Sequence, residues 1–256
     1  MTEPTRLVAP AKLTVELRLT GVRDDGYHLI DAEMVSLELH DVLTVGAGDS
    51  LTASGPFADG MPLDDSNLVR KALRLAGRTA AVHVEKLIPH GGGLGGGSAD
   101  AAAVLRWCGY DDLVAASRLG ADIPFCLRGG RARVTGIGEV LEPLPHEERT
   151  VTLIIPPFGV STPAVFRRWD ELGGPVGEQR NDLEPAAVDV EPRLATWRDR
   201  IASTLGVRPV LAGSGATWFV EGHHPRAMAM AEESTVIFTR TRPRERPNQR
   251  QRNRPN

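Results

Sequence analysis

Apolar and polar residues alternate along two long stretches near the N-terminus. Residues 13–19 and 34–45 both follow this two-residue period, which is typical of β-strands with one buried face. Shorter apolar runs bounded by turn residues predict further strands over 81–88, 132–140, 151–155, 208–212 and 216–220. The chain is therefore expected to form sheet in both its N-terminal and its C-terminal half.

Helical spacing of apolar residues appears between these strands. It predicts helices over 67–76, after residue 98, and over 112–119, 162–172 and 192–205. Strands that dominate the first half and a mixed second half favour an α+β fold over a doubly wound α/β fold. The proline-rich, charged segment 142–149 is interpreted as a connection between two domains, 1–147 and 148–238.

The C-terminal segment 239–256 differs from the rest in composition. It holds seven arginines, one glutamate and no aliphatic side chain, so we expect a disordered tail that buries nothing. A solvated extension is the simpler interpretation, and contact with nucleic acid or an acidic surface is the alternative.

Composition excludes several classes of protein. With 41% hydrophobic and 25% charged residues, the 256-residue chain reads as an ordinary globular protein. The N-terminus has no apolar targeting segment, and no stretch is long enough to span a membrane. Cys108 and Cys126 have neither metal-binding nor redox spacing, so we expect a cytoplasmic protein.

Residues 91–97 hold six glycines in seven positions and lead into an alanine-rich helix, with Ser98 expected to cap its first turn. Glycines allow the backbone to wrap closely around a ligand, and a helix N-terminus offers N–H groups and a positive dipole end to an anion. The run is therefore interpreted as a phosphate-binding loop rather than as a flexible linker.

Two other phosphate loops fit less well. A Walker A loop would end in Gly-Lys-Ser/Thr, and no lysine follows these glycines. Gly91, Gly93 and Gly96 match the dinucleotide pattern, with acids further on at Asp111 and Asp112, but no second strand precedes those acids.

Lysine is scarce in this chain. Only Lys12, Lys71 and Lys86 occur among the 30 basic residues. A lysine kept in such an arginine-rich chain can be needed as a compact point charge, which a planar guanidinium does not replace. Lys12 and Lys86 are therefore candidate functional residues.

Several motifs occur together, in this order: Pro10-Ala-Lys-Leu, Asp25-Gly-Tyr-His, the glycine loop, Gly120-Ala-Asp-Ile-Pro, Arg180-Asn-Asp-Leu-Glu-Pro and Leu211-Ala-Gly-Ser-Gly-Ala-Thr. As a set they resemble the GHMP kinases over residues 8–222. The resemblance implies two domains, the first similar to domain 2 of ribosomal protein S5 and the second ferredoxin-like. Within this family, the sequence most resembles the members that phosphorylate a cytidine-diphosphate-linked alcohol.

The resemblance implies transfer of the γ-phosphoryl group of ATP to the 2-hydroxyl of a cytidine-diphosphate-linked erythritol, in non-mevalonate isoprenoid synthesis. It implies a small-molecule substrate and Mg²⁺ carried with the nucleotide, without protein metal ligands. Neither nucleic acid nor membrane is expected as a partner, and a monomer or weak homodimer is expected.

Residue roles follow from the matched motifs. Asp122 matches the base that takes the hydroxyl proton, and Lys12 matches the lysine that orients it; a neighbouring ammonium favours the ionised form that a base requires. For Asp122 a turn or helix cap is the alternative, and for Lys12 a surface lysine. The nucleotide contacts are expected from Asn67, Leu68, Lys86, Gly91, Gly92, Gly93, Leu94, Gly95, Gly96, Gly97 and Ser98.

On the acceptor side, Tyr27 matches a residue that stacks on cytosine and His28 one that contacts the base. Phe166 would provide the opposite face, because a base binds well between aromatic rings. An ordinary core phenylalanine and an ordinary loop histidine are the alternatives. Thr14, Thr162, Pro163 and Gly213 are expected to line the same site.

The chain departs from the family pattern at Thr14, where an asparagine is usual, and in a shortened helix after the glycine loop. Replacing the amide by a hydroxyl removes one hydrogen bond, worth roughly 1 kcal/mol. Two alternatives therefore stay open: a catalytically weak nucleotide-binding protein on the same scaffold, and a GHMP kinase for homoserine, mevalonate or a sugar.

Overall fold

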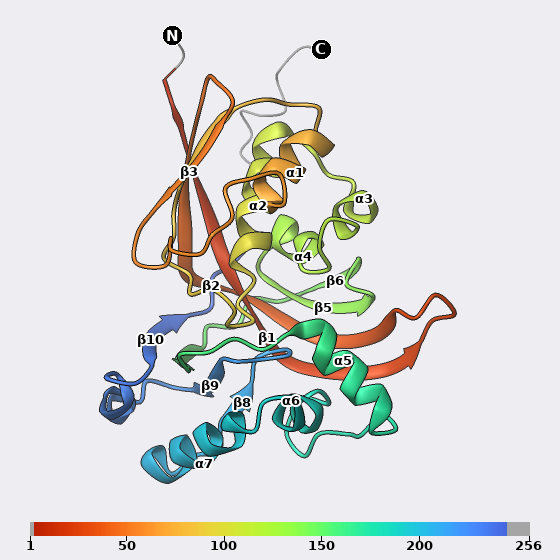
Figure 1. Cartoon of the computed structure of the whole chain (residues 1–256), viewed down its shortest axis with the longest axis vertical. Helices are drawn as coiled ribbons and strands as arrows, with labels where there is room; N and C mark the ends of the chain where they lie inside the picture. Colours follow the sequence, from red (N-terminus) through yellow and green to blue (C-terminus); the bar gives the residue numbers. More distant parts are fainter. Residues whose placement is uncertain (1–2, 245–256) are drawn as a thin grey trace.

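Two β-sheets, each with its own helices, form the upper and lower halves of the molecule in Figure 1. The computed structural model describes residues 3–244. Strands dominate the first part of the chain, and strands and helices mix in the second. The predicted α+β fold with two domains is confirmed.

The first sheet has six strands in the order β3-β4-β2-β5-β6, with β1 paired to β2 outside this path. Only β3 and β4 pair in parallel. The strands are β1 (Thr5–Val22), β2 (His28–Gly46), β3 (Ser50–Ser54), β4 (Ala81–Glu85), β5 (Arg131–Gly136) and β6 (Val140–Leu144). The long hairpin of β1 and β2 extends from the upper half to the side of α5 in the lower half (Figure 1).

Four helices accompany this sheet: α1 (Leu68–Leu75), α2 (Gly96–Cys108), α3 (Leu113–Ser117) and α4 (Ile123–Arg128). Helix α2 is the central one, because it packs against α1, α4 and β1. Its residues 99–105 are all buried, and most of them are alanines that allow close approach of its neighbours. The start of α2 is therefore held in place by the core.

The second sheet has the order β10-β7-β9-β8, and all its pairs are antiparallel. Its strands are β7 (Thr150–Ile155), β8 (Val210–Leu211), β9 (Trp218–Glu221) and β10 (Thr235–Arg240). Between β7 and β8 lie α5 (Thr162–Glu171), α6 (Glu184–Val190) and α7 (Arg193–Leu205), and a 3₁₀ helix, Pro225–Met230, precedes β10. This connectivity and strand order are those of the expected ferredoxin-like unit.

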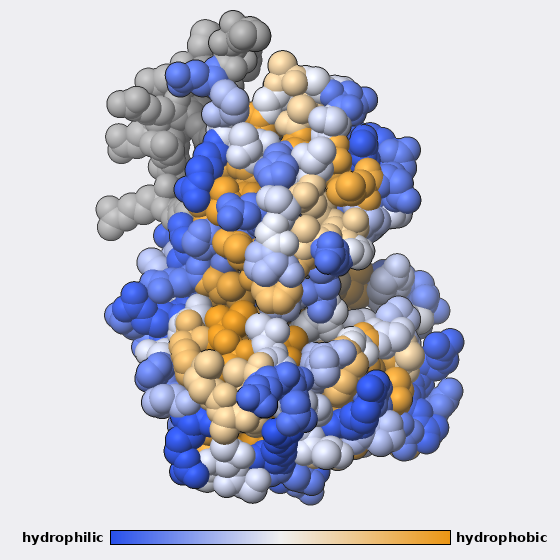
Figure 2. Space-filling view, turned by 60° about the vertical axis from the view of Figure 1, so that its left-hand side comes forward, coloured by the Kyte–Doolittle hydropathy of each residue, from blue (hydrophilic) through white to orange (hydrophobic). Residues whose placement is uncertain are grey.

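The face seen in Figure 2 carries both polar and apolar residues, with apolar residues gathered near its middle. The two cores are apolar, and Trp218, Phe219 and Phe125 are almost fully buried. No helix within residues 3–244 is long and apolar enough to cross a membrane.

Two sequence-based predictions need correction. The supposed connection 142–149 begins inside β6, which pairs with β5, so only its later part links the sheets. The tail predicted over 239–256 is ordered at its start, since β10 runs to Arg240 and both Thr239 and Thr241 are buried. Hydroxyls allow these threonines to be buried with partners: Thr241 Oγ1 accepts a hydrogen bond from Arg149 N at 2.9 Å.

Residues 245–256 of the predicted tail lie outside the described residues. The boundary at 147/148 falls between β6 and β7, and as a division into domains it stays a prediction. The structure also has elements that were not predicted: strands β3, β6 and β10, helices α4 and α6, and the 3₁₀ helix Pro225–Met230.

Candidate active site

Lys12 lies where the regular pairing of β1 with β2 is interrupted. The register shifts between Pro10 and Lys12 and again between Thr14 and Glu16. Such bulges redirect side chains and are frequent beside active sites. Here they allow Lys12 and Thr14 to be buried together, and Lys12 Nζ donates a hydrogen bond to Thr14 Oγ1 at 3.2 Å.

The ammonium group of Lys12 also reaches Asp122, which is 110 residues away in the sequence. Lys12 Nζ lies 3.3 Å from Asp122 Oδ2, and the side chains are 6% and 31% exposed. The pair is therefore buried on the lysine side and open to a ligand on the carboxylate side. The structure brings the two predicted catalytic residues together.

Asp122 occupies the N-cap position of α4, but its carboxylate makes no capping hydrogen bond. The alternative interpretation of Asp122 as a helix cap therefore fails. Its backbone conformation is helical rather than extended, and an extended backbone is what a capping side chain normally requires. The carboxylate is left for Lys12 and for a ligand.

The glycine loop adopts a backbone that other residues rarely reach. Gly91, Gly93 and Gly95 have φ of 68°, 73° and 69°. A Cβ on Gly95 would lie 2.8 Å from Lys12 Cγ, so the loop presses directly on the lysine. Helix α2 begins at Gly96 with Gly95 as its N-cap, so the prediction that Ser98 caps this helix is wrong.

The loop is also fastened on both sides. Leu94 is buried, and its carbonyl accepts a hydrogen bond from Lys12 N at 3.0 Å, so its side chain anchors the loop instead of facing a nucleotide. From the second sheet, Ala216 N and Thr217 N donate to the carbonyls of Gly91 and Gly92 at 3.4 and 3.3 Å. Both halves of the molecule therefore hold the loop.

Lys86 is not where the sequence interpretation placed it. Its side chain is 1% exposed and makes ion pairs with Asp41 and with Asp100, the latter at 2.8 Å. Burial lowers the pKa of Lys86, but Asp100 and Asp41 outweigh burial and raise it. The ammonium group therefore lies in the core, where it binds Asp100 near the start of α2. The expected contact of Lys86 with the nucleotide is corrected accordingly.

The two acids that hold Lys86 were missed in the sequence. Asp41 is fully buried, and besides Lys86 it accepts hydrogen bonds from the backbone N–H groups of Leu87 and Ile88 at 2.6 and 2.8 Å. Burial raises the pKa of Asp100 to about 7 despite the opposing charge of Lys86, and Asp41 adds to the rise. The available signal was Asp100 as a single acid within the alanine-rich run, and Asp41 among the apolar residues of the segment 34–45.

Asn67 and Leu68 lie at the start of α1, close to the loop. The Asn67 side chain caps α1, since its Oδ1 accepts from Val69 N at 2.7 Å and its Nδ2 donates to Pro62 O at 2.6 Å. Leu68 Cδ1 is 3.6 Å from the position of a Cβ on Gly97. Leu68 therefore borders the glycine loop, while the amide of Asn67 is already used.

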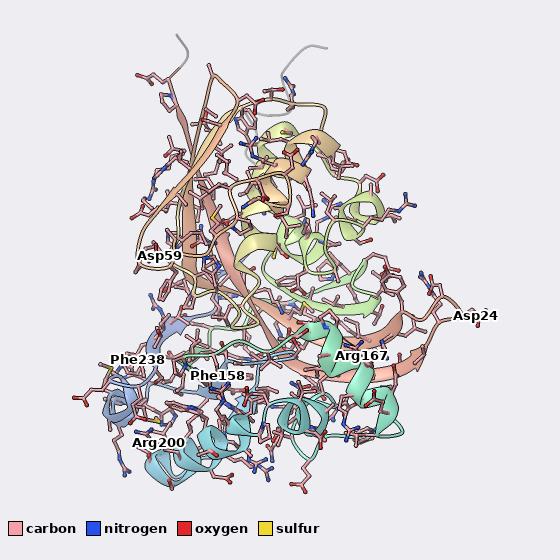
Figure 3. The ribbon with its side chains drawn as sticks, in the orientation of Figure 1. Asp24, Asp59, Phe158, Arg167, Arg200 and Phe238 are labelled. Carbon is pink, nitrogen blue, oxygen red and sulfur yellow. The ribbon has the colours of Figure 1, made fainter. Side chains whose placement is uncertain are left out.

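Tyr27 and His28 end the turn between β1 and β2 but differ in surroundings. Tyr27 is 57% exposed, and the guanidinium carbon of Arg23 lies 5.5 Å from its ring centroid. Asp24, in the same turn, marks the far tip of the hairpin in Figure 3. His28 turns inward to α5.

His28 joins the hairpin to α5. Its ring centroid lies 4.8 Å from that of Phe166 and 5.6 Å from that of Trp169, and its Nε2 is 2.8 Å from Asp170 Oδ1. The predicted pair His28–Phe166 is therefore brought together, and Phe166 is only partly buried. Trp169 and Asp170 were missed, because only the tertiary packing of α5 places them at this histidine.

Thr162, Pro163 and Gly213 lie between the two halves of the molecule. Thr162 and Pro163 open α5, and Thr162 Oγ1 is 2.7 Å from Ser214 Oγ. A Cβ on Gly213 would lie 3.8 Å from Lys12 Nζ. The turn after β8 therefore reaches the lysine.

Asn181 fixes this turn. Its Nδ2 donates to Leu211 O at 2.8 Å and to Gly213 O at 2.7 Å, and its side chain is almost fully buried. The Arg180-Asn-Asp-Leu motif thus fixes the backbone of the turn that reaches Lys12.

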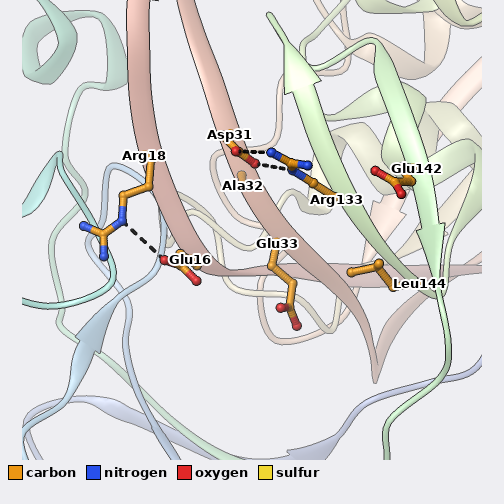
Figure 4. A pocket seen from close by; sticks show the side chains of 8 residues that line it. All are labelled: Glu16, Arg18, Asp31, Ala32, Glu33, Arg133, Glu142 and Leu144. Atoms are coloured by element: carbon orange, nitrogen blue, oxygen red, sulfur yellow. Dashed lines mark hydrogen bonds and ion pairs between the residues drawn. The ribbon is translucent and has the colours of Figure 1, made fainter.

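A polar cavity of about 370 Å³ opens elsewhere on the first sheet (Figure 4). It is lined by Glu16, Arg18, Asp31, Ala32, Glu33, Arg133, Glu142 and Leu144. Arg133 binds Asp31 through two hydrogen bonds of 2.8 and 2.6 Å, so this pair is already satisfied. The cavity contains none of the predicted site residues.

Within residues 3–244, no group of three or more histidine, cysteine or acidic side chains is placed to hold a metal ion.

Comparison with known proteins agrees with this arrangement. Residues 67–130, which include the glycine loop and Asp122, match the family described as the GHMP kinases N terminal domain. The fold and the site thus define a kinase of the GHMP class.

Two related proteins identify a particular family within the GHMP kinases. The 4-diphosphocytidyl-2-C-methyl-D-erythritol kinase of Paracoccus denitrificans (strain Pd 1222) is 44% identical over 238 residues, which cover 84% of this chain and 85% of the relative. A crystal structure of 4-(cytidine 5'-diphospho)-2C-methyl-D-erythritol kinase has a TM-score of 0.72 at 30% identity, covering 93% of this chain and 99% of the other. The chain belongs to the family of the 4-diphosphocytidyl-2-C-methyl-D-erythritol kinases.

A more distant structure shares the fold alone. Homoserine kinase from Cytophaga hutchinsonii ATCC 33406 has a TM-score of 0.61 at 16% identity, covering 96% of each chain.

Proposed function

We propose that this protein transfers the γ-phosphoryl group of ATP to the 2-hydroxyl of 4-diphosphocytidyl-2-C-methyl-D-erythritol. The observation that carries the proposal is the Lys12–Asp122 pair at 3.3 Å, placed beside a glycine loop that leads into α2. The 44% identity to a kinase named for this acceptor supports the choice of substrate.

Asp122 is the candidate general base. Its carboxylate is partly exposed, makes no capping bond and is held by Lys12 on one side, so an acceptor hydroxyl can approach it from the other. A base within hydrogen-bond reach takes the proton as the oxygen attacks phosphorus. This step needs no covalent intermediate on the protein.

Lys12 and the glycine loop supply positive charge and donors. Negative charge on the transferring phosphoryl group is stabilised by a nearby ammonium group and by backbone N–H groups aimed at it. The first turn of a helix has N–H groups without partners inside the helix, and α2 begins at Gly96 directly after Gly95, which touches Lys12. The ammonium group of Lys12 and the N-terminus of α2 can therefore act on the same phosphoryl group.

The acceptor would be recognised at the β1–β2 turn and α5. A cytosine ring can stack on the exposed face of Tyr27 and meet Phe166 and His28 on the opposite side. Thr14 keeps a hydroxyl at the position where the family usually has an asparagine, and this hydroxyl already orients Lys12. The substitution therefore preserves the catalytic pair.

We further propose that Mg²⁺ arrives bound to the nucleotide, where it would neutralise phosphate charge. We also propose a cytoplasmic location, a role in isoprenoid synthesis and a monomeric or weakly dimeric state. Nucleic-acid and membrane partners are not expected. These proposals rest on the kinase family to which the chain belongs.

A coupled assay of ADP formation tests the proposal. The purified chain is given ATP and Mg²⁺ with the cytidine-diphosphate-linked erythritol, homoserine, mevalonate or galactose, and ³¹P NMR locates the new phosphate ester. Turnover with the cytidine compound alone is expected. Turnover with another alcohol would support a different GHMP kinase, and ATP binding without turnover would support the weak nucleotide-binding alternative.

A further inference from the structure

The turn between β5 and β6 lies directly against the backbone that carries Asp122. A Cβ on Gly138 would lie only 2.5 Å from the carbonyl oxygen of Ala121, the residue before Asp122. Gly138 is also buried and has φ of 120°, which only glycine adopts readily. The two turns are therefore in backbone contact, with no space for a side chain between them.

Glu139 holds the β5–β6 turn in this shape. Its Oε2 accepts a hydrogen bond from Ile137 N at 2.7 Å. A Cβ on Gly136 would lie 2.7 Å from both carboxylate oxygens, so the carboxylate lies folded back over its own turn. The Glu139 carboxylate therefore lies against Gly136 and hydrogen-bonds to Ile137 within the same turn.

The contacted backbone is itself a tight turn. Ile123 N donates to Gly120 O at 3.0 Å, which places Ala121 and Asp122 at the two central positions. A shift of the Ala121 carbonyl therefore rotates the peptide that leads into Asp122. Since a misplacement of about 1 Å in a catalytic group can lower the rate about 100-fold, this backbone contact is significant for turnover.

The β5–β6 turn is also close to the acceptor side of the site, through the pairing of β5 with β2. The pKa of Arg23 is raised, mainly by its hydrogen bond with Asp25, and the negative charge of Glu139 adds to the rise. Arg23 lies beside Tyr27 in the β1–β2 turn. Gly136 at the start of the β5–β6 turn also pairs with Ile30 of β2, so this turn lies beside both the backbone of Ala121 and the hairpin that carries Tyr27.

We propose that Glu139 is a positioning residue for phosphoryl transfer: its carboxylate holds the turn 136–139 against Ala121 and so fixes the location of the Asp122 carboxylate. This inference rests on the proposed function. The hydrogen-bond acceptor, rather than the charge, carries the effect, since the bond from Ile137 N to the carboxylate reinforces the backbone bond from Gly138 N to Thr135 O across the same turn.

The first experiment compares Glu139→Ala, Glu139→Gln and a matched control, Glu142→Ala, in the full chain. Glu142 is an exposed acid on β6 with its side chain at the Figure 4 cavity. Glu139→Ala is expected to lower kcat about 10- to 100-fold with an unchanged KM for ATP. Glu139→Gln, whose amide oxygen still accepts from Ile137 N, is expected within about threefold of wild type, as is Glu142→Ala.

The second experiment separates positioning from a general loss of structure. Residual turnover is measured for Asp122→Asn with and without Glu139→Ala, and melting temperature is recorded for each protein. If Glu139 acts through Asp122, the second substitution adds less than about a twofold loss, because groups that act as a unit are not additive. A full additional loss would overturn the proposal, as would an unchanged kcat for Glu139→Ala or a Gln variant as poor as Ala.

These outcomes are distinct from failure of the proposed function. If wild type does not phosphorylate the cytidine compound, the function fails. If wild type is active and the Glu139 variants behave as the control does, only the positioning role fails.

Discussion

The two ends of the candidate site are built differently. At the phosphoryl-transfer end, Lys12 is 6% exposed in its side chain, is fixed by Thr14 and Asp122, and lies under a glycine loop held from both halves of the molecule. At the acceptor end, Tyr27 is 57% exposed at the side of a hairpin tip, and His28, which packs on Phe166 and Trp169, has an exposed polar partner in Asp170.

This difference matches what each end must do. Stabilising charge in a transition state requires groups that are already in place, because reorganising them during the reaction would raise the barrier. Recognising a base needs an aromatic surface that the ligand can reach. The phosphoryl-transfer end is therefore expected to respond to substitution through kcat, and the acceptor end through substrate affinity.

The strongest test of the preformed end is Asp122→Asn. The amide keeps the size of the side chain but cannot take a proton, so turnover is expected to fall about 10²- to 10⁴-fold. ATP affinity, measured by calorimetry, should stay within about threefold because Asp122 is not part of the glycine loop. Turnover within tenfold of wild type would remove Asp122 from the role of base.

Lys12→Arg is expected to be nearly as damaging as Lys12→Ala, with kcat lowered about 10²- to 10³-fold in both. A guanidinium is larger and planar, and the Gly95 backbone already lies against Lys12, where a Cβ would be 2.8 Å from Cγ. Steady-state kinetics of both variants give the measurement.

The third lysine of the chain provides a control for Lys12. Lys71 lies on α1 and is only partly buried, so Lys71→Arg should stay within about twofold of wild type. An active Lys12→Arg enzyme would show that a point charge is not needed there.

At the open end, Tyr27→Ala should weaken binding of the cytidine substrate about 10- to 100-fold, because a stacked base is worth about 1–3 kcal/mol. ATP affinity and kcat should barely change. Tyr27→Phe should be mild, since the ring face makes the contact. Calorimetric titration decides: an unchanged dissociation constant for Tyr27→Ala would make this residue structural and remove its support for the cytidine substrate.

Much of the fold could be predicted because local signals agree with the tertiary structure. The helix predicted over 192–205 is α7, Arg193–Leu205, which ends where Gly206 adopts φ of 71°. The helix predicted over 67–76 is α1, Leu68–Leu75, capped by Asn67. Strand β10 was missed because its pairing with β7 is long-range.

Site residues could be predicted where a sequence motif contains them, but not where tertiary packing alone brings them to the site. Lys12 and Asp122 were identified by resemblance, and the structure places them together. Lys86 was misplaced because sequence does not reveal that β2 and α2 bring Asp41 and Asp100 to it. Asp170 reaches His28 only through the position of α5.

The buried support of the preformed end should be visible in stability rather than in turnover. Burial raises the pKa of Asp100 to about 7. A group whose pKa is higher in the folded than in the unfolded protein stabilises the fold at low pH, and this contribution is lost as pH rises through the folded pKa. The unfolding free energy of wild type should therefore fall, relative to that of Asp100→Asn, between about pH 4 and pH 7, by about 1–3 kcal/mol. Urea denaturation of both proteins at pH 5 and pH 8 measures this difference. Parallel changes in the two proteins would mean that Asp100 stays ionised beside Lys86 throughout, so that the preformed end is not stabilised by protonation of its buried acid.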